Sequence, residues 1–249
     1  MSADGPRYPG LLVDATPILP LLFSVKHRSV HADSVRIASR LSPPLVVHGH
    51  IPNYSRTLFL INHYGRPGFP SWWIGIALSS VIVRDIHWVM TAAWEFERGV
   101  RARVLTPLTR WLFTRLARVY DFTTMPPMPP RPHQLRERAQ AMRQVLRVVG
   151  MHPEIHIGLA PEGDDNEQRI LGTPPPGAGR FIHLLCSRNL IPVPVGIYEQ
   201  DGKLHLNIGA PFLLPSPSSS RTKNDTYIIN AVMTAIAACL PDNLRGDYA

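Results

Sequence analysis

Short apolar runs of β-like pattern alternate with segments of helical periodicity from Leu45 to the end of the chain. Such alternation favours a parallel sheet, because each helix must carry the chain back to the edge at which the next strand begins. The last two apolar runs flank Asp201-Gly202, a dipeptide typical of hairpin turns, so we expect one antiparallel pair at an edge. The sequence therefore predicts an α/β fold with a mixed, mostly parallel sheet flanked by helices. We expect strands over residues 45–48, 57–61, 86–90, 118–122, 155–159, 193–198 and 203–208, and helices over 71–83, 94–98, 106–116, 134–149, 178–188 and 224–240.

The length of 249 residues is ordinary for one α/β domain. Residues 1–43 are irregular and interrupted by prolines, and we expect an N-terminal appendage with a short helix over 32–41. Residues 44–249 are predicted to form a single domain. Its proline-rich stretch 124–132 is expected to be a stiff, extended connector.

The charge balance favours an anionic partner. The chain carries 26 basic and 18 acidic residues, a net charge of +8. A phosphorylated ligand, an anionic bilayer or nucleic acid would suit this charge. Nucleic acid is not expected, because no run of basic residues is interleaved with aromatic ones as in stacking modules.

No uninterrupted apolar run reaches the roughly 18 to 20 residues that a spanning helix needs. The apolar segment 11–25 contains Asp14, Pro17 and Pro20, which argues against a signal peptide. The two cysteines lack a CxxC partner and fit a reducing compartment. We therefore expect a cytoplasmic protein that meets a membrane only at its surface, on the inner face.

Residues 101–119 have the pattern of an amphipathic helix with arginines around an apolar face. An interfacial helix on anionic lipid has this pattern. A core-facing helix with a solvated basic face has it too, and periodicity does not distinguish the two. The pair Trp72-Trp73, expected to be exposed, also suits a headgroup boundary.

Asn62-His63 ends an apolar run and precedes a loop rich in Gly and Pro that leads to a helix near Ser71. An imidazole in this place faces the carboxyl edge of the sheet, with helix N–H groups nearby. Such an arrangement suits a general base beside an oxyanion site. The alternative is that His63 only caps the strand or binds a loop carbonyl.

Glu162-Gly163 follows a second apolar run in the same manner. The acidic turn 162–165 is either a solvated helix-capping loop or a Mg²⁺ site, as in a metal-dependent hydrolase. The pair His48 and His50 presents two imidazoles on one strand, but no third ligand lies at a suitable spacing. We expect no metal site.

Several segments resemble the phospholipid/glycerol acyltransferase superfamily, exemplified by the bacterial 1-acylglycerol-3-phosphate acyltransferases. The resemblance covers about residues 45–212. It rests on VVHG at 46–49, INH at 61–63, APEG at 160–163, GAGR at 177–180, IPVPV at 191–195 and KLHLNIGAPF at 203–212.

The resemblance implies a glycerol-phosphate-acyltransferase-like fold and transfer of a fatty acyl group to a hydroxyl of a lipid or lysolipid acceptor. The donor would be acyl-coenzyme A or acyl carrier protein, used as a co-substrate, and no cofactor is implied. His63 would be the general base. The residues expected to bind substrate are Asn62, Arg66, Glu162, Gly163, Arg169 and Arg180.

The chain departs from the family pattern in three places. Gly68 stands where the family has the Asp that orients the imidazole, Asp165 stands where it has an Arg, and residues 118–122 lack another expected Arg. Asp85, Asp121 or Glu162 could replace the missing acid, and Arg66, Arg169 and Arg180 could form a rearranged anion site. The rival hypothesis is a non-catalytic member that binds a lipid or acyl chain.

Overall fold

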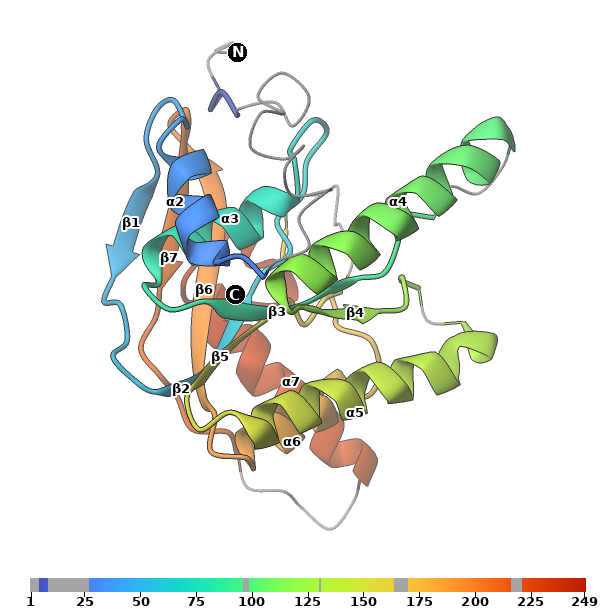
Figure 1. Ribbon diagram of the computed structural model, residues 1–249. Helices are drawn as coiled ribbons and strands as arrows, with labels where there is room; N and C mark the ends of the chain where they lie inside the picture. Colours follow the sequence, from blue (N-terminus) through green and yellow to red (C-terminus); the bar gives the residue numbers. More distant parts are fainter. Residues whose placement is uncertain (1–4, 9–26, 96–98, 130, 164–169, 216–220) are drawn as a thin grey trace.

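The computed structural model describes residues 5–8, 27–95, 99–129, 131–163, 170–215 and 221–249. A seven-stranded sheet in the order β1-β7-β6-β2-β5-β3-β4 forms its centre (Figure 1). All neighbouring strands are parallel except β6 and β7, so the expected mixed, mostly parallel sheet is confirmed. The strands are β1 (Val46–Gly49), β2 (Arg56–Ile61), β3 (Ile86–Thr91), β4 (Thr123–Met125), β5 (Ile155–Leu159), β6 (Ile191–Gln200) and β7 (Lys203–Ile208).

Helices cover both faces of the sheet. Figure 1 shows α2, α3 and α4 on one face and α5, α6 and α7 on the other. Their bounds are α2 (Val30–Ala38), α3 (Trp72–Val81), α4 (Gly99–Tyr120), α5 (Leu135–Met151), α6 (Ala178–Cys186) and α7 (Arg221–Ala237), with short 3₁₀ turns at Pro132–Gln134, Asp242–Leu244 and Gly246–Tyr248. Within the described part of the chain, no helix combines the length and the apolarity that crossing a bilayer requires.

The strand β2 lies between β5 and β6 and carries the middle of the core. Leu58, Phe59, Leu60 and Ile61 are fully buried, as expected for a strand covered on both faces. Burial of side chains this large contributes roughly 1.5–3 kcal/mol each. The end of β2 is therefore held firmly against its neighbours.

Two predicted elements were wrong. The strand expected over 118–122 is the end of α4, and β4 begins only at Thr123. Asp121 adopts a left-handed φ of 55° and ends the helix there. The helix expected over 94–98 does not include Trp94 or Glu95, which lie in a connection before α4, and residues 96–98 lie outside the described part.

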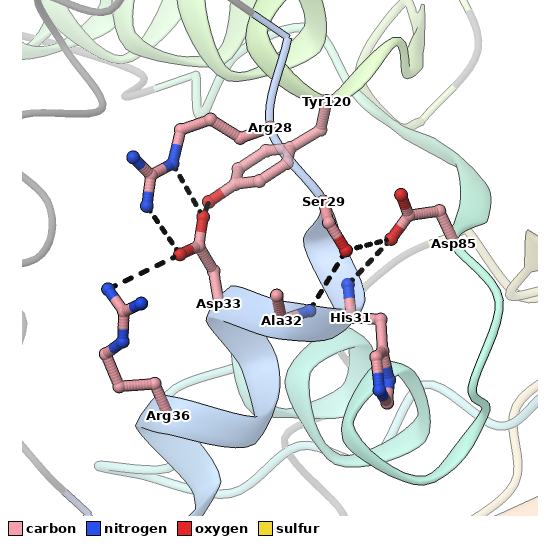
Figure 2. A network of polar contacts seen from close by, with 8 residues as sticks. All are labelled: Arg28, Ser29, His31, Ala32, Asp33, Arg36, Asp85 and Tyr120. Atoms are coloured by element: carbon pink, nitrogen blue, oxygen red, sulfur yellow. Dashed lines mark hydrogen bonds and ion pairs between the residues drawn. The ribbon is translucent and has the colours of Figure 1, made fainter.

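Polar contacts fix α2 to the end of α4 and the start of β3 (Figure 2). Asp33, 6% exposed, accepts hydrogen bonds from Arg28 Nε at 2.8 Å and Nη2 at 2.6 Å, and from the Tyr120 hydroxyl at 2.9 Å. Ser29 caps α2 and donates to Asp85 Oδ1 at 2.8 Å. These contacts join three segments that are far apart in sequence.

Replacing Asp33 by Asn is expected to lower the free energy of unfolding by roughly 1–3 kcal/mol near neutral pH, because charge-assisted hydrogen bonds are lost in a buried place. Burial acts to raise the pKa of Asp33, but hydrogen bonds from Arg28 and Tyr120 outweigh burial, and the pKa is lowered. A carboxyl group with a lowered pKa stabilises the fold above its unfolded pKa and loses this contribution as pH falls through the folded value.

The difference between wild type and Asp33→Asn should therefore shrink below about pH 4, as urea unfolding at several pH values would measure. Asp242→Asn is the control, because Asp242 is 90% exposed in its pair with Arg245 and should contribute little. A difference that stays constant down to about pH 2 would contradict the role of the Asp33 carboxylate.

Candidate functional site

The carboxyl ends of β2, β5 and β6 bring three polar side chains to one edge of the sheet. His63 lies two residues beyond β2, Glu162 lies three residues beyond β5, and Glu199 is the penultimate residue of β6. Parallel strands place such residues together, and sites in α/β folds are built at this edge. The candidate site is defined by these three residues and the loop from Tyr64 to Pro70.

Asn62 fixes the path of the chain into His63. Its side-chain Nδ2 donates to the Ile197 carbonyl at 2.9 Å, and its Oδ1 accepts from the Ile197 N–H at 2.7 Å. The side chain, 3% exposed, thus continues the pairing of β2 with β6 beyond the last residue of the strand. Both polar atoms of this amide are used within the protein, so the expected contact of Asn62 with substrate stays a prediction.

Glu162 holds the backbone of His63 from the other side. Its Oε1 accepts the His63 N–H at 2.7 Å, and its Oε2 accepts the Gly172 N–H at 2.6 Å. The residue is 5% exposed. Burial raises the pKa of Glu162, and the two N–H donors and the charge of His63 offset only part of the increase.

The three carboxylates considered as substitutes for the missing acid are not equivalent. Asp85 precedes β3 and Asp121 precedes β4, so both lie at the amino ends of the strands, away from His63. Asp85 is engaged in capping α2. Of these three, Glu162 is the one beside His63, and it bonds the backbone N–H of this residue.

Gly163 lies beneath the proline-rich segment. It has a φ of 73°, and a Cβ added there would lie 3.3 Å from Met128 Cγ. The segment before Met128 is itself fixed, because Arg138 Nη2 donates to the carbonyls of Pro126 and Pro127 at 3.1 Å each. Met128 therefore packs over Gly163, a contact that no sequence pattern indicated.

Arg66 is paired within the protein. Its Nη2 donates to Glu199 Oε1 at 2.6 Å and its Nε donates to Oε2, while the hydroxyls of Tyr8 and Tyr64 donate to the same carboxylate at 2.6 and 3.3 Å. Burial acts to raise the pKa of Glu199, but the bonds from Arg66 and the tyrosines outweigh burial, and the pKa is lowered. Glu199 thus neutralises Arg66, the cation that was predicted to contribute to an anion site.

An aromatic cluster packs around this pair. Phe69 makes edge contacts with Tyr8 and Tyr64, with ring centroids 5.5 and 5.0 Å apart, and Tyr8 also contacts Trp73. Trp73 is fully buried, so the expected exposure of the Trp72-Trp73 pair was wrong for Trp73. The sequence offered a signal for Glu199, an acid at the end of an apolar strand, but none for Tyr8.

The start of α6 is occupied by a carboxylate of this chain. Asp225 accepts the Gly177 N–H at 2.6 Å and the Arg180 N–H at 2.8 Å. The side chain of Arg180 is exposed. Arg169, with Asp164 and Asp165, lies outside the described residues, so their predicted roles stay predictions.

The start of α3 has less capacity for an oxyanion than expected. The N–H groups of Trp73 and Ile74 donate to the carbonyls of Pro70 and Ser71 at 2.9 and 3.1 Å.

On the edge strand β1, His48 Nε2 lies 2.9 Å from His205 Nδ1, and the two rings stack. In the described ranges, no group of three or more His, Cys, Asp or Glu side chains is arranged to hold a metal ion.

Asn62→Ala is expected to lower the free energy of unfolding by roughly 2–4 kcal/mol, because the buried N–H and carbonyl of Ile197 lose their partners. Urea unfolding measures this change. Asn62→Asp keeps an acceptor for the Ile197 N–H but buries a carboxylate against the Ile197 carbonyl oxygen, so near neutral pH it should lose at least as much as Ala. Asn53→Ala, at an exposed position, should have almost no effect, and an equally small loss for Asn62→Ala would contradict the anchoring role.

Restoring the family's acid with Gly68→Asp is expected to destabilise the fold by roughly 1–2 kcal/mol, because the backbone there is left-handed, with a φ of 80°. Space is not the obstacle, since an added Cβ would lie 3.7 Å from Arg66 Nη1. Gly68→Ala carries the same strain without the charge and should lose a similar amount. Melting or urea curves unchanged in both variants would show that the loop relaxes.

Comparisons with known proteins show a similar fold. The chain is similar to the crystal structure of the 1-acyl-sn-glycerophosphate (LPA) acyltransferase PlsC from Thermotoga maritima, with a TM-score of 0.52 and 12% sequence identity. The similarity covers 88% of this chain and 80% of that structure. No protein-family model matches the sequence, and no curated protein matches it either. At this identity the finding concerns architecture: the chain has the α/β fold of an acyltransferase.

Proposed function

We propose that this protein transfers a fatty acyl group from a thioester donor, acyl-coenzyme A or acyl carrier protein, to a hydroxyl of a lipid or lysolipid acceptor. The observation that carries the proposal is His63 at the carboxyl edge of β2, its backbone held by the buried Glu162, in a fold shared with an LPA acyltransferase. The proposed place of reaction is the surface of a membrane, on its cytoplasmic face.

In the proposed reaction, the His63 imidazole takes the proton of the acceptor hydroxyl. At the same time the oxygen of this hydroxyl bonds to the carbonyl carbon of the thioester. The C–S bond then breaks, and the leaving thiolate receives the proton from the imidazolium. Backbone N–H groups stabilise the negative carbonyl oxygen in between. Since those of Trp73 and Ile74 are bonded, this role falls to other amides of the loop.

Glu162 is proposed as a positioning residue. Its two bonds to backbone N–H groups fix where the His63 main chain leaves β2, and its charge lies close enough to His63 to interact with it. A fixed base shortens the search for a productive geometry, which contributes a large share of many enzymatic rates. Glu162 and Gly163 would also shape the acceptor pocket beneath Met128.

The charges of the described site favour an acceptor that does not depend on Arg66 for recognition of phosphate. Glu199 neutralises Arg66 in a partly buried ion pair, and extracting the guanidinium would leave the carboxylate unpaired. Arg180 and Arg169 are the remaining proposed contacts to an anionic headgroup. Their contact with a headgroup is part of the proposal.

The non-catalytic alternative is favoured by one observation. Gly68, which stands where the family has its orienting acid, has a left-handed backbone that suits glycine. The loop conformation there is therefore one that an Asp would adopt only with strain. A protein of this kind would bind a lipid or acyl chain without turnover. The metal-dependent hydrolase would require Glu162 to give up two short hydrogen bonds.

The deciding experiment incubates the purified protein with mass-tagged acyl-coenzyme A or acyl carrier protein and a bacterial lipid and lysolipid extract. Removal of a general base commonly costs roughly 100- to 10,000-fold in rate, so His63→Ala should lose at least this much product. His152→Ala is the matched control, because His152 is exposed at the opposite edge of the sheet and should retain wild-type turnover.

Three outcomes would change the assignment. Equal turnover of wild type and His63→Ala would remove His63 as the base. No product with either donor, together with measurable binding of lipid or acyl thioester, would support the non-catalytic alternative. Hydrolysis that a chelator abolishes and Mg²⁺ restores would support the metal-dependent hydrolase.

A further inference from the structure

Helix α4 carries an apolar stripe that faces solvent. Val104, Leu108 and Trp111 are 56%, 52% and 51% exposed, and Pro107 between them is exposed as well. Residues three or four apart lie next to one another on a helix, so these four form one continuous surface. Among the side chains of α4 that the structure describes, only those of Phe113 and Val119 are buried.

The helix also stands away from the sheet. Figure 1 shows the first half of α4 extending beyond the other described elements, while its second half lies near β3 and β4. Trp94 packs edge-on against Phe113, with ring centroids 5.1 Å apart, on the buried side of the helix opposite the stripe. A monomer gains nothing in water from such a projecting apolar surface, so it indicates a site of interaction.

The charge within α4 is of one sign. Residues 99–120 contain five arginines and no Asp or Glu. Arg103 and Arg110 are exposed along one side of the stripe, and Arg118 is exposed at its end. Within the described ranges, no carboxylate forms an ion pair with any of these three. The surface therefore combines apolar side chains with uncompensated positive charge.

We infer that the exposed face of α4 is a docking surface for an anionic lipid bilayer. Exposed Val, Leu and Trp side chains insert at the boundary between headgroups and acyl chains, while arginines beside them bind the anionic headgroups. A bilayer receives a projecting helix without needing a complementary groove, and the net charge of +8 adds to its attraction. The inference builds on the membrane location in the proposed function, but its test needs no turnover.

The position of α4 relates the docking surface to the candidate site. β3 runs parallel to β5, and its carboxyl end leads into the start of α4. The projecting half of the helix therefore begins at the same edge of the sheet as His63. A bilayer bound there would present its acyl chains and headgroups at the edge of the sheet that carries His63.

The test measures binding of the purified full-length protein to vesicles by flotation. Vesicles of phosphatidylcholine alone are compared with vesicles that contain 30 mol% phosphatidylglycerol, a composition chosen as roughly physiological in surface charge. Wild type should bind the anionic vesicles, weaken as salt is raised, and bind the neutral vesicles far less. Absence of binding to anionic vesicles, or equal binding to both, would overturn the inference.

Two double variants distinguish the effect of the α4 arginines from the effect of the net charge of the protein. Arg103→Glu combined with Arg110→Glu should weaken binding roughly tenfold or more. Arg143→Glu combined with Arg147→Glu makes the same change of charge at exposed positions of α5 and should weaken it much less. Equal losses in the two double variants would show that only net charge matters and would contradict a docking role for α4.

The apolar part is tested with Leu108→Ser combined with Trp111→Ser, against Leu135→Ser combined with Tyr227→Ser at exposed positions elsewhere. The first pair should lose roughly tenfold or more in vesicle binding and the second pair little. Both pairs should unfold like wild type. Binding of an acidic acyl carrier protein but not of vesicles, or self-association lost in the first pair, would assign the surface to a protein partner and overturn the inference.

Discussion

The anchoring of the chain at the end of β2 is the constraint on which the site depends. A strand covered on both faces must end in a turn that leaves no buried backbone group without a partner. Asn62 meets this requirement with its side-chain amide, and Glu162 meets it with its carboxylate. His63 is thereby placed between two fixed strands before any substrate contact is considered.

The need of buried polar groups for partners also explains the charges around the site. A carboxylate that is largely removed from water is stabilised when donors surround it, and the partly buried Glu199 has Arg66, Tyr8 and Tyr64. This arrangement fixes the loop after His63 and ties a residue near the N-terminus to it. It also commits Arg66, so recognition of a substrate phosphate cannot rest on this cation at full charge.

The sequence predicted the layers of the fold better than the identity of the contacts. Periodicity and turn residues were sufficient for β5, the β6–β7 hairpin and α5, because burial and turn geometry are local properties of the pattern. The aromatic and β-branched residues 118–122 resembled a strand, yet α4 continues to Tyr120 because its end packs against Asp33 and Phe122. Tertiary packing decided that boundary, and local preference could not.

The candidate site shows the same division. His63 and Glu162 could be singled out because each follows an apolar run and enters a Gly-containing turn, and parallel topology then places them together. Their actual contact is a hydrogen bond from the His63 N–H to the Glu162 carboxylate. It depends on the register of β2 and β5, which the sequence pattern of the two strands does not reveal.

Topology also connects the site with the exposed face of α4. A right-handed crossover from β3 to β4 must start at the carboxyl edge of the sheet, so the first turns of α4 lie at that edge whatever their sequence. Arginine and apolar residues there, with no acid over 99–120, give an anion-attracting surface to the same edge of the sheet at which His63 lies. Docking of this surface on a bilayer would hold the edge of the sheet that carries His63 close to the membrane, which favours an acyl substrate because exposure of its chain to water costs roughly 0.8 kcal/mol for each methylene group.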